Sequence, residues 1–166
     1  MSLSVSVLIP TYNYAERIIE AIKSVLNQRY PSSLIEIIVV DDGSTDNTQE
    51  VLNELVDNKS IKYFYQSNQG KASATIKAIK ESTGDIIFCL DADDSFLPGK
   101  IQKTVEIFEQ NYSVYGRKDD NRIEKNRNLL ASSSAILTYL SNDKIDNKLT
   151  KLYSQFQQNE WYEFDA

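Results

Sequence analysis

The sequence predicts an α/β fold: a mostly parallel sheet with helices on both faces, followed by a helical C-terminal tail. Short, continuously apolar runs rich in β-branched residues occur four times between residues 5 and 90. Each run is followed by a longer segment whose apolar residues recur at helical spacing. Strands that alternate with helices in this way form parallel sheets, with right-handed connections over both faces.

The first predicted strand covers residues 5–9, a β-branched run that ends at Pro10. Asn13 and Glu16 then form a capping-box-like pair, which predicts a helix start. The second strand is expected over residues 35–40, where another apolar run ends at an acidic doublet. Runs that are apolar at every position are typical of strands buried on both faces.

The second half of the sheet follows the same pattern. A third strand is predicted over residues 61–65, and Gly70 begins the helix that Gly84 ends. The fourth strand, residues 85–90, runs directly into an acidic cluster. Pro98 then stands where the first turn of a helix tolerates proline.

The chain changes character after about residue 112. We expect a core over residues 1–112, a polar and mobile connection over 113–128, and a helical tail over 129–166. Two alternatives stay open for the tail: it covers the sheet, or it binds a partner chain or a second copy of this chain. The core is the part to which the motifs belong.

Composition excludes several classes of function. The 166 residues contain no histidine and one cysteine, which excludes imidazole chemistry, an internal disulfide and a thiolate zinc cluster. A formal charge of −6 argues against nucleic acid as a partner. No apolar run is long enough to cross a bilayer, and the first residues do not resemble a signal peptide. We therefore expect a cytoplasmic protein, with any membrane contact peripheral at the inner face.

Polar clusters follow all four predicted strands. Because parallel strands place their carboxyl ends at one edge of the sheet, and ligands bind at that edge, the clusters are expected to share a site. The clusters are Pro10-Thr11-Tyr12-Asn13, Asp41-Asp42, Asn68-Gln69-Gly70 and Asp91-Ala92-Asp93-Asp94.

The acidic cluster after the fourth strand predicts a cation site. Alternation along an extended segment would place Asp91 and Asp93 on the same side. Hard carboxylate oxygens suit Mg²⁺ or Mn²⁺, and Mg²⁺ commonly completes its shell with phosphate oxygens. The implied ligand is a nucleotide diphosphate. The alternative is that these acids cap the next helix.

The second strand end and the first carry groups that suit a nucleoside. A carboxylate of Asp41 or Asp42 can accept a hydrogen bond from the imide N–H of uracil or from ribose hydroxyls. For one of these two acids, capping of the next helix is an equally good explanation. Tyr12 can stack on a base. Neither G-x-G-x-x-G nor a Walker A sequence occurs, so a metal would have to neutralise the pyrophosphate.

Taken together, these motifs resemble the family 2 glycosyltransferases of GT-A fold, a Rossmann-like architecture, across about residues 4–110. The resemblance implies an inverting transfer of a sugar from a nucleotide-diphosphate donor, usually UDP-linked, with Mn²⁺ or Mg²⁺ as cofactor. It implies that Asp93 ligates the metal and that Asp91 lies beside the ribose and the metal. The other donor-binding positions that it implies are Pro10, Thr11, Tyr12, Asp41, Asp42, Asn68, Gly70 and Ala92, to which Lys71 is added from its position beside Gly70.

The sequence departs from the family pattern in two places. Thr75 and Ile76 stand where family members usually carry arginine and asparagine, and Lys71 is the candidate substitute for the missing cation. The acceptor-binding half is not recognisable after residue 112. No catalytic base is assigned, and the acceptor is an unidentified glycan, lipid-linked group or protein. The carboxylates available there are Asp119, Asp120, Glu160, Glu163 and Asp165.

Two other functions compete with an active transferase. One is a shortened nucleotide-sugar-binding domain that does not turn over. The other is a phosphatase of the haloacid-dehalogenase type, in which Asp91 would be the nucleophile. In that class the D-x-D motif normally follows the first strand of the chain, whereas here three predicted strands precede it.

Overall fold

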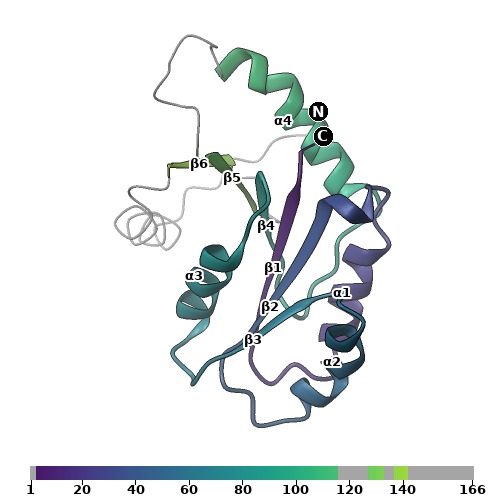
Figure 1. Ribbon diagram of the computed structural model, residues 1–166, viewed down its shortest axis with the longest axis vertical. Coiled ribbons are helices and arrows are strands. Elements are labelled where there is room, and N and C mark those ends of the chain that lie inside the picture. The colour runs from purple at the N-terminus through teal and green to yellow at the C-terminus, as the bar shows by residue number, and fades with distance from the viewer. Residues whose placement is uncertain (1–2, 116–126, 133–136, 142–166) are drawn as a thin grey trace.

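The computed structural model describes residues 3–115, 127–132 and 137–141, and its side chains up to residue 109 (Figure 1). Helices follow strands in the order that the sequence predicts. The elements are β1 Val5–Thr11, α1 Ile18–Leu26, β2 Ile35–Asp41, α2 Thr48–Asp57, β3 Lys62–Tyr65, α3 Lys71–Glu81, β4 Ile86–Cys89, α4 Lys100–Tyr115, β5 Arg127–Ser132 and β6 Leu137–Ser141. A short 3₁₀ turn, Ser32–Leu34, leads into β2.

The strands form one mixed sheet in the order β3-β2-β1-β4-β5-β6. All neighbouring pairs from β3 to β5 are parallel, and β6 runs antiparallel to β5. The strand order turns around at β1, which lies between β2 and β4. The predicted α/β class with a mostly parallel sheet is confirmed.

Two apolar layers enclose the sheet. Figure 1 shows α3 on one face, and α1 and α2 on the other. Side chains alternate along β1, so that Val5, Val7 and Ile9 join the core cluster containing residues of α1, α2 and α4, while Leu8 joins the cluster under α3. Burying an aliphatic side chain of this kind stabilises the fold by about 1.5–3 kcal/mol. The clusters hold the strand ends in fixed positions.

Pro10 fits into the central strand β1 because the pairing of β1 with β4 stops before it. Even-numbered residues of β1 bond towards β4, as the contact from the Leu90 amide to the Leu8 carbonyl shows (2.9 Å). Pro10 has the same parity, but the pairing of β1 with β4 stops at Leu8 and Cys89. The missing N–H of Pro10 therefore costs no ladder bond. Beyond this point β1 pairs with β2 alone, which leaves an opening beside the ends of β1 and β4.

The predicted helical tail is wrong over residues 129–132 and 137–141, which belong to β5 and β6. Leu129 and Leu130 pair with Ile86 and Ile87 of β4, which supplies the second neighbour that a buried central strand needs. Short apolar groups do not define a period, so the sequence pattern there fits a strand as well as a helix. Residues 116–126 of the predicted connection and residues 133–136 and 142–166 of the tail lie outside the described residues. The expectation of a partner bound through the tail therefore stays a prediction.

Within the described ranges, no helix is both long and apolar enough to cross a membrane.

Candidate functional site

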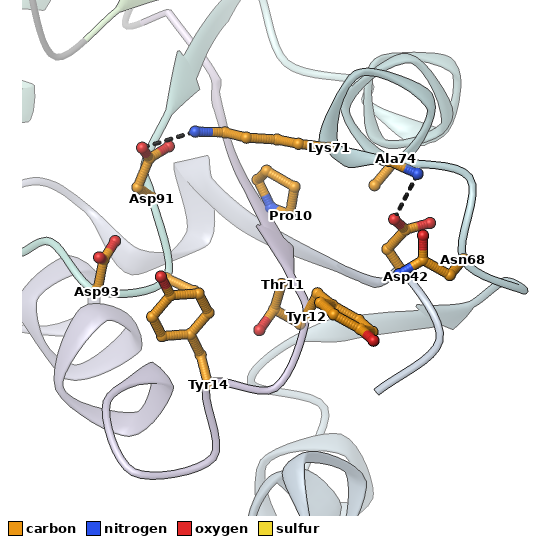
Figure 2. Close-up of a pocket in the computed structure, with 12 residues that line it drawn as sticks. Pro10, Thr11, Tyr12, Tyr14, Asp42, Asn68, Lys71, Ala74, Asp91 and Asp93 are labelled. Carbon is orange, nitrogen blue, oxygen red and sulfur yellow. Dashed lines mark hydrogen bonds and ion pairs between the residues drawn. The ribbon is translucent and has the colours of Figure 1, made fainter. Parts of the chain in front are cut away.

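A pocket of about 430 Å³ opens at the carboxyl ends of β1, β2 and β4, beside the beginning of α3 (Figure 2). All four polar clusters of the sequence contribute to it, as the predicted parallel strands require. Its lining residues are Pro10, Thr11, Tyr12, Tyr14, Asp42, Asn68, Gly70, Lys71, Ala74, Asp91, Ala92 and Asp93. Of the predicted positions, Asp41 is not among them.

Asp41 is a structural residue beneath the pocket. Its carboxylate is 1% exposed and accepts hydrogen bonds from the Tyr63 hydroxyl (2.8 Å) and the Ser44 amide (2.7 Å). Burial and the bond to Asp41 raise the pKa of Tyr63 well above its ordinary value, so the phenol stays protonated as a donor. The carboxylate thus fixes a turn in the loop after β2 and does not cap α2, which begins only at Thr48, so the helix-capping alternative does not describe Asp41.

Asp42, the other acid of the doublet, lines the pocket and also holds the loop before α3. Its carboxylate accepts bonds from the amides of Gln69 (2.9 Å) and Gly70 (2.7 Å) and from the Gln66 side chain (2.7 Å). A carboxylate has about four acceptor positions, so these bonds leave capacity for a donor on a ligand. Asp42 is 3% exposed, and its orientation is therefore fixed.

Gly43 lets the loop before α3 approach the end of β2 closely. Its φ is +83°, and a Cβ at this position would lie 2.7 Å from the Asn68 backbone nitrogen. Any other residue would be strained and would push the loop away. The glycine thereby lets Asn68 lie at the pocket wall, beside Tyr12.

The loop that carries Tyr12 is fastened to the loop after β2. Asn13 has a left-handed backbone (φ +58°), and its side-chain oxygen accepts hydrogen bonds from the amides of Thr45 (2.7 Å) and Asp46 (3.3 Å). The Asn13 amide donates in return to the Ser44 hydroxyl (2.9 Å). The Tyr12 ring is 44% exposed and lies beside Asp42 and Asn68 (Figure 2), so one of its faces is open to a ligand.

Asp91 and Asp93 both line the pocket, although the segment is not extended as expected. The Asp94 amide donates to the Asp91 carbonyl (3.0 Å), which makes a turn. The Asp91 carboxylate forms an ion pair with the Lys71 ammonium at 2.7 Å, in which the side chains are 45% and 59% exposed. Lys71 thus lies at the acidic end of the pocket, at the start of α3.

The acidic end fits a divalent cation that is completed by a ligand. Asp91 and Asp93 supply hard oxygen donors, and no cluster of three or more metal-binding side chains occurs in the described part of the chain. Mg²⁺ commonly binds through one or two carboxylates together with substrate phosphates. Two carboxylates beside an open pocket therefore suit a metal that binds with a phosphate-bearing ligand.

Thr75 and Ile76, the two departures from the family pattern, serve the packing of α3. The Thr75 hydroxyl donates to the Lys71 carbonyl within the helix (2.8 Å), and Ile76 packs against the core cluster under α3. Neither side chain lines the pocket. Tyr14 and Ala74 do line it, and sequence reasoning missed both. For Tyr14 the available signal was its place in the loop that follows β1.

A family model described as glycosyl transferase family 2 matches residues 6–162. The chain belongs to this family. An uncharacterized glycosyltransferase of Nostoc sp. is 43% identical over 109 residues, covering 64% of this chain and 33% of that protein. Poly-β-1,6-N-acetyl-D-glucosamine synthase of Staphylococcus epidermidis is 32% identical over 133 residues, covering 80% of this chain and 32% of that protein. This family 2 chain thus spans about a third of the length of these relatives.

Solved structures agree with the family assignment and the GT-A fold. Residues 1–349 of S. aureus TarS, in complex with UDP-GlcNAc, are 26% identical with a TM-score of 0.59, covering 75% of this chain and 39% of that one. A mannosyltransferase from Pyrobaculum calidifontis, in complex with GDP-Man and Mn²⁺, is 29% identical with a TM-score of 0.57, covering 61% and 31%. The neighbours therefore include enzymes holding a nucleotide sugar, in one case together with Mn²⁺.

Proposed function

We propose that the pocket binds a UDP-linked sugar and that this family 2 chain carries the donor site of a metal-dependent, inverting glycosyltransferase. The observation that carries the proposal is a single pocket with an aromatic ring and a carboxylate at one end and two carboxylates with a lysine at the other. A nucleoside diphosphate has the matching parts: a flat base, hydrogen-bond donors, and a pyrophosphate that needs cations.

The Tyr12 end suits the nucleoside. Stacking of a base on an aromatic ring stabilises a complex by about 1–3 kcal/mol. The free acceptor capacity of Asp42 faces the same space, where it can accept the uracil imide N–H or a ribose hydroxyl. The TarS structure with UDP-GlcNAc supports a uridine nucleotide as the ligand.

The acidic end suits the diphosphate. When bound, Mn²⁺ or Mg²⁺ would supply charge stabilisation for the departing diphosphate. Asp93 and Asp91 would hold the cation. Lys71 would pair with a phosphate oxygen and so replace the arginine that family members usually carry at the position of Thr75. The mannosyltransferase structure with GDP-Man and Mn²⁺ supports a metal at such a site.

Inverting transfer breaks one bond and forms one. An acceptor hydroxyl oxygen attacks the anomeric carbon from the side opposite the diphosphate, and the bond from that carbon to the phosphate oxygen breaks with its electrons leaving on the nucleoside diphosphate. The hydroxyl proton passes to a base. The carboxylates that the sequence offers for this role, Asp119, Asp120, Glu160, Glu163 and Asp165, lie outside the described residues. The acceptor is left open as a glycan, a lipid-linked group or a protein.

Turnover is tested by measuring UDP release from UDP-GlcNAc and UDP-glucose by the full chain with Mn²⁺. We expect Asp93→Asn to lower the rate about 100-fold, since loss of a metal ligand removes several kcal/mol of charge stabilisation. Asp94→Asn is the matched control, because Asp94 is an exposed acid next in sequence that does not line the pocket.

The outcomes separate the three functions. UDP release that is lost in Asp93→Asn and kept in Asp94→Asn supports the transferase. Binding of UDP-sugars without release supports a donor-binding domain that does not turn over. Release of phosphate from phosphomonoesters, abolished by Asp91→Ala, would support the phosphatase, which family membership disfavours.

A further inference from the structure

Tyr14 is a pocket residue for which the motifs assign no role. Tyr12 and Tyr14 come from the same loop but serve opposite ends of the pocket (Figure 2). The Tyr12 ring lies beside Asp42 and Asn68. The Tyr14 ring stands upright, with its hydroxyl directed towards the segment that carries Asp91 and Asp93.

The backbone of Tyr14 is held in place on both sides. Its carbonyl accepts bonds from the Arg17 and Ile18 amides (3.0 Å each), so it closes the turn that leads into α1. The next amide, of Ala15, donates to the Asp46 carboxylate (3.1 Å), and the preceding residue, Asn13, is bonded to the loop after β2. Because these bonds already fix the backbone, binding a ligand through Tyr14 costs little further backbone entropy.

The acidic end of the pocket suits an uncharged hydrogen-bond donor. Two carboxylates and one lysine line this end, and a diphosphate would bring further negative charge. A hydroxyl donates a hydrogen bond to a phosphate oxygen without altering the charge balance between the carboxylates, the lysine and a cation. The Tyr14 side chain is 39% exposed, which leaves it open to the pocket.

We propose that the Tyr14 hydroxyl donates a hydrogen bond to a phosphate oxygen of the donor diphosphate. The residue makes the pocket prefer the diphosphate over the bare nucleoside, while Tyr12 contributes equally to both. This inference rests on the proposed donor site and adds a specificity residue to it.

The test compares ligands that share a nucleoside and differ in phosphate. Uridine, UDP with Mn²⁺, and Mn²⁺ alone are titrated into the wild-type chain, Tyr14→Phe and Tyr12→Ala. A hydrogen bond to a charged group contributes enough for Tyr14→Phe to weaken UDP binding about tenfold. Its affinity for uridine and for Mn²⁺ alone should stay within about twofold, since the ring and the carboxylates remain. Tyr12→Ala should weaken uridine and UDP by the same factor.

Several results would overturn the assignment of Tyr14. Unchanged UDP affinity in Tyr14→Phe would show that the hydroxyl does not contact the diphosphate. An equal loss for uridine and UDP would indicate general damage to the pocket, and weaker binding of Mn²⁺ alone would mean that the hydroxyl acts on the carboxylates. A wild-type chain that fails to bind UDP would overturn the donor site itself, so the two failures are distinguishable. The melting temperature of Tyr14→Phe should match that of the wild type, because only one exposed hydroxyl is removed.

Discussion

The ion pair between Lys71 and Asp91 is the contact inside the pocket that a ligand would rearrange. An exposed pair of this kind contributes about 0–1 kcal/mol, so exchanging it for other partners costs little. With a diphosphate and a cation present, Lys71 can move to a phosphate oxygen and Asp91 to the metal. In the proposed donor site, the lysine would thus compete with a cation for Asp91 before the diphosphate binds and would assist the diphosphate afterwards.

Replacing Lys71 by methionine should therefore change two affinities in opposite directions. We expect UDP with Mn²⁺ to bind about tenfold more weakly, because a charge-assisted contact to phosphate is lost. Mn²⁺ alone should bind at least as tightly as in the wild type, since no ammonium competes for Asp91. Calorimetric titrations measure both, with Lys71→Arg as the charge-preserving control. If both affinities fall together in Lys71→Met, the lysine merely maintains the shape of the pocket.

At the level of single residues, the sequence located the site better than it assigned roles. Asp41 and Asp42 are identical in type and adjacent, so only the direction of each side chain at the end of β2 separates a buried structural acid from a pocket acid. The sequence indicated Tyr12 as a pocket residue but not Tyr14, although both line the pocket, because the sequence does not show the direction of a side chain in a loop. Whether a side chain in a loop faces a pocket depends on bonds between loops, such as those of Asn13, which no local pattern reveals.

At the level of the elements, Glu36 joins three strands and the loop before β4, at the edge of the sheet opposite the pocket. It stands on β2 and accepts hydrogen bonds from Ser6 of β1, from Lys62 of β3 (2.6 Å) and from the Thr83 and Gly84 amides before β4. Burial alone would raise the pKa of Glu36, but the bonds from Lys62, Ser6 and Thr83 outweigh it and hold the pKa below the ordinary value of 4.5. The ionised form is therefore the one that stabilises the sheet.

Stability should depend on pH through this residue. A carboxyl whose pKa is lower in the folded chain contributes fully above its unfolded pKa, and the contribution is lost as pH falls through the folded value. We expect Glu36→Ala to lower the free energy of unfolding by about 2 kcal/mol at pH 7, because amide donors lose their acceptor. The difference from the wild type should shrink as pH falls below 4.5.

Urea unfolding across this pH range measures the effect, and the affinity for UDP at pH 7 is the internal control because Glu36 lies far from the pocket edge. A difference between Glu36→Ala and the wild type that stays constant from neutral to acidic pH would contradict the role assigned to the ionised carboxylate.

The elements that the sequence predicted well are those that a short, local pattern of residues encodes. The buried strands β1, β2 and β4 are encoded by apolar runs, whereas the edge strand β3 is partly exposed. The observed bounds of β3 and β4 differ from the predicted ones by a residue at their ends. By contrast, β5 and β6 were missed. Leu129 and Leu130 become strand residues by pairing with β4, and that pairing is a long-range contact that periodicity cannot show.

For the molecule as a whole, the parallel sheet explains why widely separated motifs act together. Residues 10–14, 42, 68–74 and 91–93 meet because β1, β2 and β4 end at one edge and α3 begins there. The sequence predicted this meeting from the order of strands and helices alone. The acceptor side could not be predicted, because the recognisable motifs end near residue 112 and the matched part of this chain covers only about a third of the length of these relatives.

The most direct measurement is a calorimetric titration of UDP into the full chain, with Mn²⁺ and with a chelator in its place. If Asp91 and Asp93 hold a cation that bridges to the diphosphate, the affinity should fall at least about tenfold without the metal, since each factor of ten corresponds to 1.4 kcal/mol. Asp93→Asn should bind UDP equally weakly under both conditions. UDP affinity that is the same with and without Mn²⁺ in the wild-type chain would contradict the proposed metal-dependent donor site.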